Sequence, residues 1–187
     1  MKQAVLRDPR LLTPALDPRD RIPLARVGQL YVRPAEGAPV RGVRGATLVA
    51  GRGIEEDYYF HKLDPHSPTH DPGDELTLIS REAINRVQIE LDLPLADGQH
   101  RRQIVLNGIP PEALVKLIGR RFTLGGAVCE GVADCTPCAY LQKKLAVKGL
   151  VKAFLKTGGL RARVVQGGLV ALGDTLEVAE HSPLAAA

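Results

Sequence analysis

The sequence predicts a mainly β fold of the α+β class, in which a barrel or strongly bent sheet carries a few short helices at its rim. Short strand-like runs bounded by glycine and proline recur along the chain, whereas apolar residues at helical spacing occur in only a few segments. Strands and helices do not alternate regularly, so a parallel βαβ sheet is not expected. The chain has 187 residues and is 44% hydrophobic, which is enough for one buried core.

The expected organisation is one domain between two loose ends. Residues 1–25 contain four prolines and are expected to form an extended arm. The domain is expected to span residues 26–180. Residues 181–187 then remain as a loose C-terminal tail.

The first part of the domain is expected to contain strands and one long loop. Residues 27–32 form a strand-like run, and residues 44–53 form another that glycines close. Residues 61–75 are rich in Pro, Asp, Ser and Gly, which predicts a long surface loop. The loop leads into an alternating strand at residues 76–80.

A helix is expected directly after that strand. Ser80 is a suitable N-cap, because its hydroxyl can accept a hydrogen bond from the first helical turn. Ile84, Val87 and Leu91 then fall at i, i+3 and i+7, which gives one buried stripe. Pro94 ends the helix.

The second half is expected to contain further strands and short helices. Residues 103–106 predict a short buried strand, and residues 110–119 predict a short helix that stops at a glycine. Each of the segments 120–132 and 161–172 has a central Gly-Gly pair. Both are interpreted as β-hairpins, because glycine adopts the positive φ angles that tight hairpin turns require.

The segment between these two hairpins is expected to be helical. Its apolar residues follow helical spacing, and Gly149 is expected to break it into two pieces. The residues of the expected apolar stripe are Val147, Leu150, Val151, Phe154 and Leu155.

Charge and composition restrict the functional classes. The net charge is +4, but 25 basic residues are offset by 21 acidic ones and only 4% of residues are aromatic, so nucleic-acid binding is poorly supported. A pocket for an anionic small molecule fits equally well. There is no long apolar run, no secretory signal and no disulfide framework. A cytoplasmic protein without a membrane segment is therefore expected.

The stretch "DCTPCAYL" (134–141) holds two of the three cysteines and allows four interpretations. A structural zinc site needs four ligands, and no suitably spaced histidine pair follows Cys135 and Cys138. A thioredoxin-like redox pair would start a helix within a βαβ unit, which is missing. The pair could simply pack, because free cysteine is a small apolar residue. Alternatively Cys138 is a single functional thiol, since it begins a helical run and a helix N-terminus favours a thiolate.

Five segments, taken in order, resemble MOSC domains, the family named after the C-terminal domain of molybdenum cofactor sulfurases. The resemblance covers residues 26–178 and implies a β-barrel of the MOSC type. It also implies that one cysteine holds sulfur or ligates the molybdenum of the pterin cofactor, and Cys138 matches this cysteine by position. No role is transferred to Cys135. The five segments are "GRGIEEDYYF", "DELTLISREAI", "RRQIVLNGI", "GRRFTLGGAVCEGVADCTPCAYL" and "GGLRARVVQGGLVALGDTLEV".

The resemblance also implies a set of residues for the molybdenum cofactor, whose phosphate requires fixed positive charge. Gln103 stands where asparagine is usual in the family, so this contact is expected to differ. For the arginines a solvated rim or an ion pair is an equal alternative, and for the aspartate a turn. The implied residues are Arg101, Arg102, Gln103, Asn107, Arg161, Arg163 and Asp57.

The leading hypothesis is a molybdenum-dependent oxidoreductase that reduces N-hydroxylated compounds at a centre ligated by Cys138. Three cysteines are too few for an iron–sulfur cluster held by four thiolates, so a separate electron-donor protein would be required. The second hypothesis is a carrier that holds sulfur as a Cys138 persulfide or holds the cofactor. No pyridoxal phosphate site is expected, because 187 residues leave no room for a desulfurase domain. A module that binds an anion or nucleic acid is the third.

Overall fold

The strands close into a barrel. The computed structural model describes residues 22–95, 98–137, 139–155 and 157–178, so residues 1–21 of the expected arm and the expected tail lie outside the described residues. The strands are β1 (Ala25–Val32), β2 (Arg41–Val43), β3 (Gly45–Val49), β4 (Gly53–Ile54), β5 (Leu76–Ser80), β6 (Ile104–Asn107), β7 (Arg121–Leu124), β8 (Ala127–Asp134), β9 (Leu160–Gln166), β10 (Gly168–Ala171) and β11 (Thr175–Val178).

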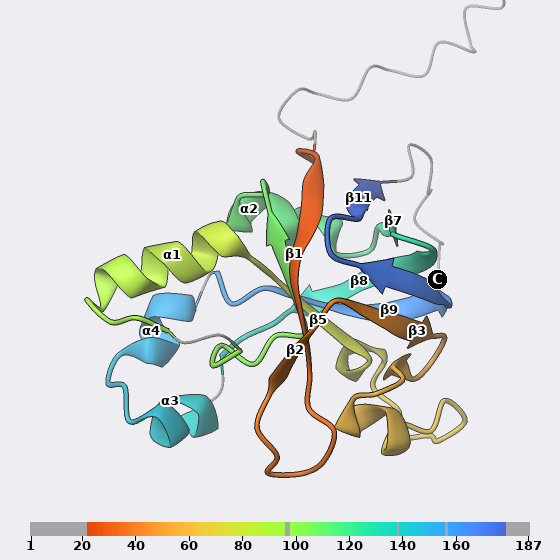
Figure 1. Ribbon diagram of the computed structural model, residues 1–187, viewed down its shortest axis with the longest axis horizontal. Helices are drawn as coiled ribbons and strands as arrows, with labels where there is room; N and C mark the ends of the chain where they lie inside the picture. The colour runs from red at the N-terminus through yellow and green to blue at the C-terminus, as the bar shows by residue number, and fades with distance from the viewer. Residues whose placement is uncertain (1–21, 96–97, 138, 156, 179–187) are drawn as a thin grey trace, which may run out of the picture.

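Seven strands form the barrel in the order β11-β7-β8-β9-β5-β6-β1, and pairing of Ala25 with Leu176 joins β1 to β11. β5 and β6 run parallel and the other barrel pairs are antiparallel, so the barrel is mixed. β2 extends β1 outside the barrel, and β10, β3 and β4 form a separate small sheet. The predicted mainly β barrel fold is therefore confirmed (Figure 1).

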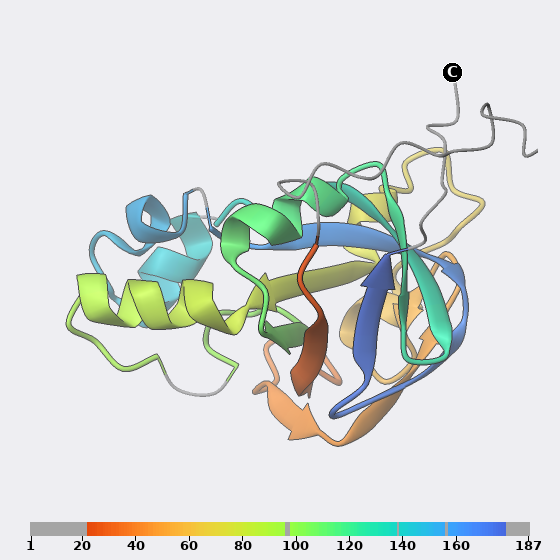
Figure 2. The same ribbon diagram turned by 90° about the horizontal axis from the view of Figure 1, so that it is seen from above.

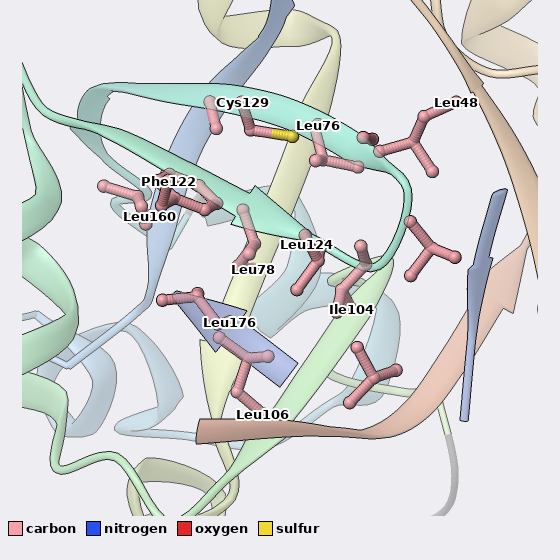
Figure 3. Packing of buried hydrophobic residues seen from close by; sticks show 14 of the residues in the cluster. Leu48, Leu76, Leu78, Ile104, Leu106, Phe122, Leu124, Cys129, Leu160 and Leu176 are labelled. Carbon is pink, nitrogen blue, oxygen red and sulfur yellow. The ribbon is translucent and has the colours of Figure 1, made fainter. Parts of the chain in front are cut away.

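The barrel interior is filled by aliphatic side chains and one phenylalanine. Leu78, Leu106, Phe122 and Leu176 come from four different strands and point toward one another (Figure 3). Their exposed fractions are 2% or less. Each large apolar side chain buried in this way contributes about 1.5–3 kcal/mol to folding. Closure of the barrel therefore rests on inward-facing residues contributed by every second position of its strands.

The helices lie mainly to one side of the barrel (Figure 2). They cover a second apolar cluster that includes Ile79, Ile84, Val87 and Phe154. The helices are α1 (Arg81–Glu90), α2 (Pro111–Leu114), α3 (Ala139–Leu145) and α4 (Leu150–Phe154), with short 3-10 turns η3 (Tyr58–His61), η4 (Pro72–Asp74) and η5 (Val115–Leu117). None of the described helices is both long and apolar enough to span a membrane.

The predicted start of α1 and the predicted break at Gly149 are confirmed, whereas the prediction that Pro94 ends the first helix was wrong, because α1 already ends at Glu90. The Ser80 hydroxyl accepts a hydrogen bond from the backbone N–H of Ala83, as expected for the N-cap of α1. Gly149 has φ +90° and separates α3 from α4. The prediction for Leu155 was wrong, because its side chain is 53% exposed. α4 ends at Phe154, so Leu155 lies beyond the helical stripe.

Only one of the two Gly-Gly segments forms the predicted hairpin. β7 and β8 pair across Gly125, which has φ +55°. The second hairpin prediction was wrong, because β10 pairs with β3 and not with β9. A Cβ on Gly168 would lie 2.2 Å from the backbone oxygen of Gly126. The second pair thus lets two backbones pass closely where the chain leaves the barrel, and it does not make a tight turn.

The predicted loop before β5 is anchored by a buried polar pair. The His70 imidazole lies 3.0 Å from a Glu75 carboxylate oxygen, and both side chains are nearly excluded from solvent. The other Glu75 oxygen accepts a hydrogen bond of 2.8 Å from the backbone N–H of Val164. Because Glu75 is held against β9, the adjacent Asp74 is carried to the side of β9 as well.

Cys129 points into the barrel and is fully buried (Figure 3). Burial and the nearby Glu75 raise the pKa of its thiol to about 12 from an ordinary value of 9.0. Above pH 9 the thiol ionises in the unfolded chain but stays neutral in the folded one. Burial of the neutral thiol therefore stabilises the folded protein fully below pH 9, and this stabilisation is lost as the pH rises toward 12.

We expect the free energy of unfolding to fall by up to about 1.4 kcal/mol per pH unit above pH 9 because of Cys129 alone. Urea unfolding of the wild type and of Cys129→Ala is measured at about pH 8, 9 and 10, which bracket the ordinary thiol pKa. The contribution of Cys129 is the difference between the two proteins in the slope of the free energy of unfolding against pH. The other titrating groups are common to both proteins. Parallel slopes would contradict the expectation.

Candidate functional site

A cavity of about 420 Å³ lies where segments far apart in the sequence meet. Its wall contains the end of β1 and the loop that follows, η3, and Thr77 of β5. The wall also contains residues 101–103, the connection from β8 to α3, and Arg161 of β9. It is completed by Asp74 and by Leu141 and Lys144 of α3. The volume lies in the range of small-molecule and cofactor sites.

Positive charge predominates among the lining residues. The acidic ones are Glu36, Asp57 and Asp74, half as many as the basic ones. A concave wall with this imbalance favours an anionic ligand. The basic lining residues are Arg33, Lys62, Arg101, Arg102, Lys144 and Arg161.

Arg102 is a buried arginine that holds the cavity wall together. Its guanidinium donates to the backbone oxygens of Gly158 at 2.7 Å, Cys135 at 2.9 Å and His100 at 3.0 Å. The Arg102 side chain therefore joins the segment before β6 to the connection after β8 and to the segment before β9. These three hydrogen bonds are structural, and the charge of Arg102 reaches the cavity from within the wall.

The glycines before β9 explain how these segments approach so closely. The backbone N–H of Cys135 donates to the oxygen of Gly159 at 2.8 Å. A Cβ on Gly158 would lie 2.3 Å from the Cys135 oxygen, and one on Gly159 would lie 2.1 Å from the Leu78 oxygen. Gly159 also has φ +110°, a backbone conformation that residues other than glycine rarely adopt.

Arg161 and Arg163 lie on the same face of β9, as their alternation predicts, but they have different surroundings. Arg161 lines the cavity, pairs with Asp74, and donates to the Gly73 oxygen. Burial opposes ionisation of Arg161, but the hydrogen bond and charge of Asp74 outweigh it and raise the pKa. Arg163 is not among the lining residues and pairs with Glu130 at 2.9 Å.

Gln103 joins two barrel strands with one end of its side-chain amide. Its Oε1 accepts hydrogen bonds from the backbone N–H of Thr77 at 2.9 Å and from the Thr77 hydroxyl at 3.0 Å. Within the described part of the chain, the Gln103 Nε2 has no hydrogen-bond partner. Gln103 lines the cavity, and its amide nitrogen is a hydrogen-bond donor. The cofactor contact expected for Gln103 stays a prediction.

Asp57 is buried and fixes the part of the cavity wall formed by the end of β1, the loop that follows and η3, which we call the mouth. Its two carboxylate oxygens accept hydrogen bonds from the backbone N–H groups of Arg33 at 3.0 Å and Tyr59 at 3.1 Å. The first joins the end of β1 to η3, and the second caps η3. These contacts agree with the alternative role considered for Asp57, in which the carboxylate satisfies the backbone of a turn.

Aromatic rings and cations meet at the mouth. The Arg33 guanidinium carbon lies 5.0 Å from the ring centroid of Tyr58 and 5.3 Å from that of Tyr59. The Tyr58 hydroxyl donates to Glu36 at 2.6 Å. This hydrogen bond, with help from Lys62, lowers the pKa of the exposed Glu36 carboxyl. A side-chain hydrogen bond between Lys62 and Tyr58 also raises the pKa of Lys62.

Of the two cysteines of "DCTPCAYL", the structure describes only Cys135. Cys138 lies outside the described residues, so its predicted role stays a prediction. Cys135 is only 4% exposed and is one of the cavity-lining residues, although it was expected to be a neighbour without a role. Thr136 before Cys138 and Leu141 after it also line the cavity.

The structure brings together five of the predicted cofactor residues and leaves two elsewhere. Arg163 is one of these two. Asn107 is the other, because it is exposed at the end of β6 and is not a lining residue. The five in the cavity wall are Asp57, Arg101, Arg102, Gln103 and Arg161.

Sequence reasoning did not select Arg33, Tyr59 or Lys144. The first two flank the mouth because the Asp57 carboxylate, at the start of η3, accepts a hydrogen bond from the backbone N–H of Arg33, and that bond links residues 24 positions apart. Lys144 was detectable only as part of the helix after Cys138. Among the described residues, no cluster of three or more His, Cys, Asp and Glu side chains could hold a metal ion by itself.

Comparison with known proteins agrees with the fold. The family model described as "MOSC domain" matches residues 66–177, more than half of the chain. A search among curated protein sequences found no match. The YuaD protein of Bacillus subtilis has a similar solved structure, with a TM-score of 0.72 and 17% identity over 87% of this chain and 99% of that chain.

Two YiiM structures are also similar. For YiiM from Geobacillus stearothermophilus the TM-score is 0.63 at 17% identity, over 83% of this chain and 75% of that chain. For YiiM from Escherichia coli it is 0.61 at 18% identity, over 87% and 71%. At this identity the likeness shows the fold, and the family model shows the family. The chain therefore belongs to the MOSC domain family.

Proposed function

We propose that this protein binds the molybdenum cofactor in the cavity and reduces N-hydroxylated compounds there, with Cys138 as the thiolate ligand of the metal and a separate protein as electron donor. The MOSC domain family is associated with molybdenum cofactor binding. The observation that carries the proposal is a cavity with excess positive charge beside the "DCTPCAYL" segment.

The residues of the cavity suit this cofactor. A phosphate requires positive charge, which Arg101, Lys144 and Arg161 supply at the wall. A flat pterin ring carries hydrogen-bonding edges, for which the Gln103 amide nitrogen is a donor. The tyrosines at the mouth offer aromatic faces for stacking. The donor set and the volume therefore fit the cofactor.

The chain's own contribution is binding, ligation and orientation. When bound, the molybdenum centre supplies oxygen-atom abstraction by cycling between oxidation states. Cys138 would provide a soft thiolate for the metal. Arg102 and Gly159 hold the backbone on the N-terminal side of that thiol through Cys135. Reduction follows R–NH–OH + 2e⁻ + 2H⁺ → R–NH₂ + H₂O, so the electrons must come from outside the chain.

Cys138→Ser is expected to lower bound molybdenum at least about tenfold, because a hydroxyl is a much weaker ligand than a thiolate. The protein is purified from a host that makes the cofactor, and metal and pterin are measured per chain. The wild type is expected to turn over an N-hydroxylated base with a chemical reductant. Loss of metal and turnover together in the variant supports the proposal.

Cys135→Ser is the matched control, since it changes the second thiol of the same segment. We expect it to retain most of the metal. The carrier alternative draws on the presence of this second thiol in the cavity wall. A Cys138 persulfide without molybdenum would support the carrier, and absence of both metal and persulfide from the wild type would contradict either cofactor-based function.

A further inference from the structure

The surface next to the cavity is formed by a segment with only one sign of charge. Residues 135–160 contain five lysines and no aspartate or glutamate. Four of these lysines lie within the described residues, and all four are exposed. They are Lys143 and Lys144 on α3, Lys148 between the helices and Lys152 on α4. We call these four the lysine surface.

The lysine surface is continuous with the candidate site. Lys144 belongs to it and also lines the cavity. α3 and α4 pack against each other and lie together beside the barrel (Figure 1). Leu155, directly after α4, adds an apolar side chain that is 53% exposed. The end of α1 lies near the connection between α3 and α4, since a Cβ on Gly149 would lie 3.5 Å from the Leu91 side chain, and the neighbouring Glu90 and Asp92 are exposed.

We propose that the lysine surface docks a small acidic one-electron carrier protein, of the ferredoxin kind, that reduces the centre in the cavity. This proposal rests on the proposed reductase function, which requires two electrons from outside the chain. A donor must approach the cavity closely, and the lysine surface borders it. Charge complementarity of this kind steers encounter and sets orientation.

Other acidic partners fit the surface less well. Single-stranded nucleic acid is usually bound by basic residues interleaved with aromatic rings on which bases stack. Residues 139–154 contain only two aromatic residues, Tyr140 and Phe154, and Phe154 is buried, so a row of stacked bases is poorly supported. Binding in the plane of a membrane relies on a longer amphipathic helix, whereas α3 has 7 residues and α4 has 5. Exposed lysines attract an acidic partner protein through complementary charge, which speeds and orients its approach.

The test uses Lys148→Gln/Lys152→Gln, which removes two charges outside the cavity lining. Arg41→Gln/Arg44→Gln is the matched control, because both arginines are exposed and neither lines the cavity. Each pair lowers the net charge from +4 to +2 (4 − 2 = 2). Binding of a plant-type [2Fe–2S] ferredoxin to the whole protein is measured by titration at low and near-physiological salt.

We expect the lysine variant to weaken binding about tenfold at low salt and the arginine variant to change it less than about twofold. Binding by the wild type should weaken as salt rises. Turnover with a chemical reductant is expected to be equal in all three proteins, whereas turnover with reduced ferredoxin should fall only in the lysine variant.

Failure of the two proposals can be told apart. Absence of turnover with a chemical reductant would overturn the reductase function, while the binding titration judges the surface independently. No ferredoxin binding, or equal loss in both variants, would overturn the docking surface. Binding of RNA or of phosphatidylserine vesicles in place of ferredoxin, lost in the lysine variant, would overturn it as well.

Discussion

Arg102→Met is expected to lower the free energy of unfolding by about 3–5 kcal/mol. The arginine side chain is 8% exposed and donates to three backbone oxygens, those of His100, Cys135 and Gly158. Methionine has similar length but no donor, so these carbonyls would be left without their partner inside the wall. Urea unfolding followed by circular dichroism measures the change.

Arg86→Met is the matched control for Arg102. It makes the same chemical change at an arginine whose side chain is 54% exposed and pairs with Glu112 on the surface. A surface ion pair of this kind contributes less than about 1 kcal/mol. Arg102→Lys is expected to rescue little, since one ammonium group cannot reach three carbonyls in the fork geometry of a guanidinium. Equal losses for Arg86→Met and Arg102→Met would contradict the structural role.

Gly159→Ala is expected to cost about 3 kcal/mol or more. Two effects act together, because Gly159 has φ +110° and because the new Cβ would lie 2.1 Å from the backbone oxygen of Leu78. That oxygen belongs to β5, which pairs with β9 at this point. Relief of the overlap would therefore separate two barrel strands next to the cavity. Thermal and urea unfolding measure the loss.

Gly173→Ala separates the two effects. Gly173 also has a positive φ, +91°, but a Cβ there would meet nothing within 4 Å. We expect a cost of about 1 kcal/mol, from backbone conformation alone. A loss at Gly159 no larger than that at Gly173 would show that the close approach to Leu78 is relieved without cost.

The sequence predicted most elements because their signals are local. The Ser80 cap, the Gly149 break and the Gly125 turn each depend on residues within one or two turns of chain. The two Gly-Gly segments show the limit of such signals. At residues 125 and 126 the pair makes a turn, while at 167 and 168 it allows backbones to pass, with a Cβ on Gly168 only 2.2 Å from Gly126 oxygen.

For the candidate site, the sequence determined which chemistry is present and not where it points. Five predicted residues do line the cavity, because the family resemblance identified segments that converge there. Their individual roles needed the third dimension. The guanidinium of Arg102 is directed into the wall, that of Arg163 toward Glu130, and that of Arg161 toward Asp74 and the cavity.

The sequence by itself thus determined the fold class, the family and a thiol-containing segment, because periodicity, capping and ordered motifs are properties of neighbouring residues. Only the tertiary structure decided that Cys135 belongs to the cavity wall while Asn107 does not, and that Arg33 meets Tyr58 and Tyr59 at the mouth of the cavity. These facts depend on barrel closure, which joins residues distant in the chain through strand register and buried hydrogen bonds.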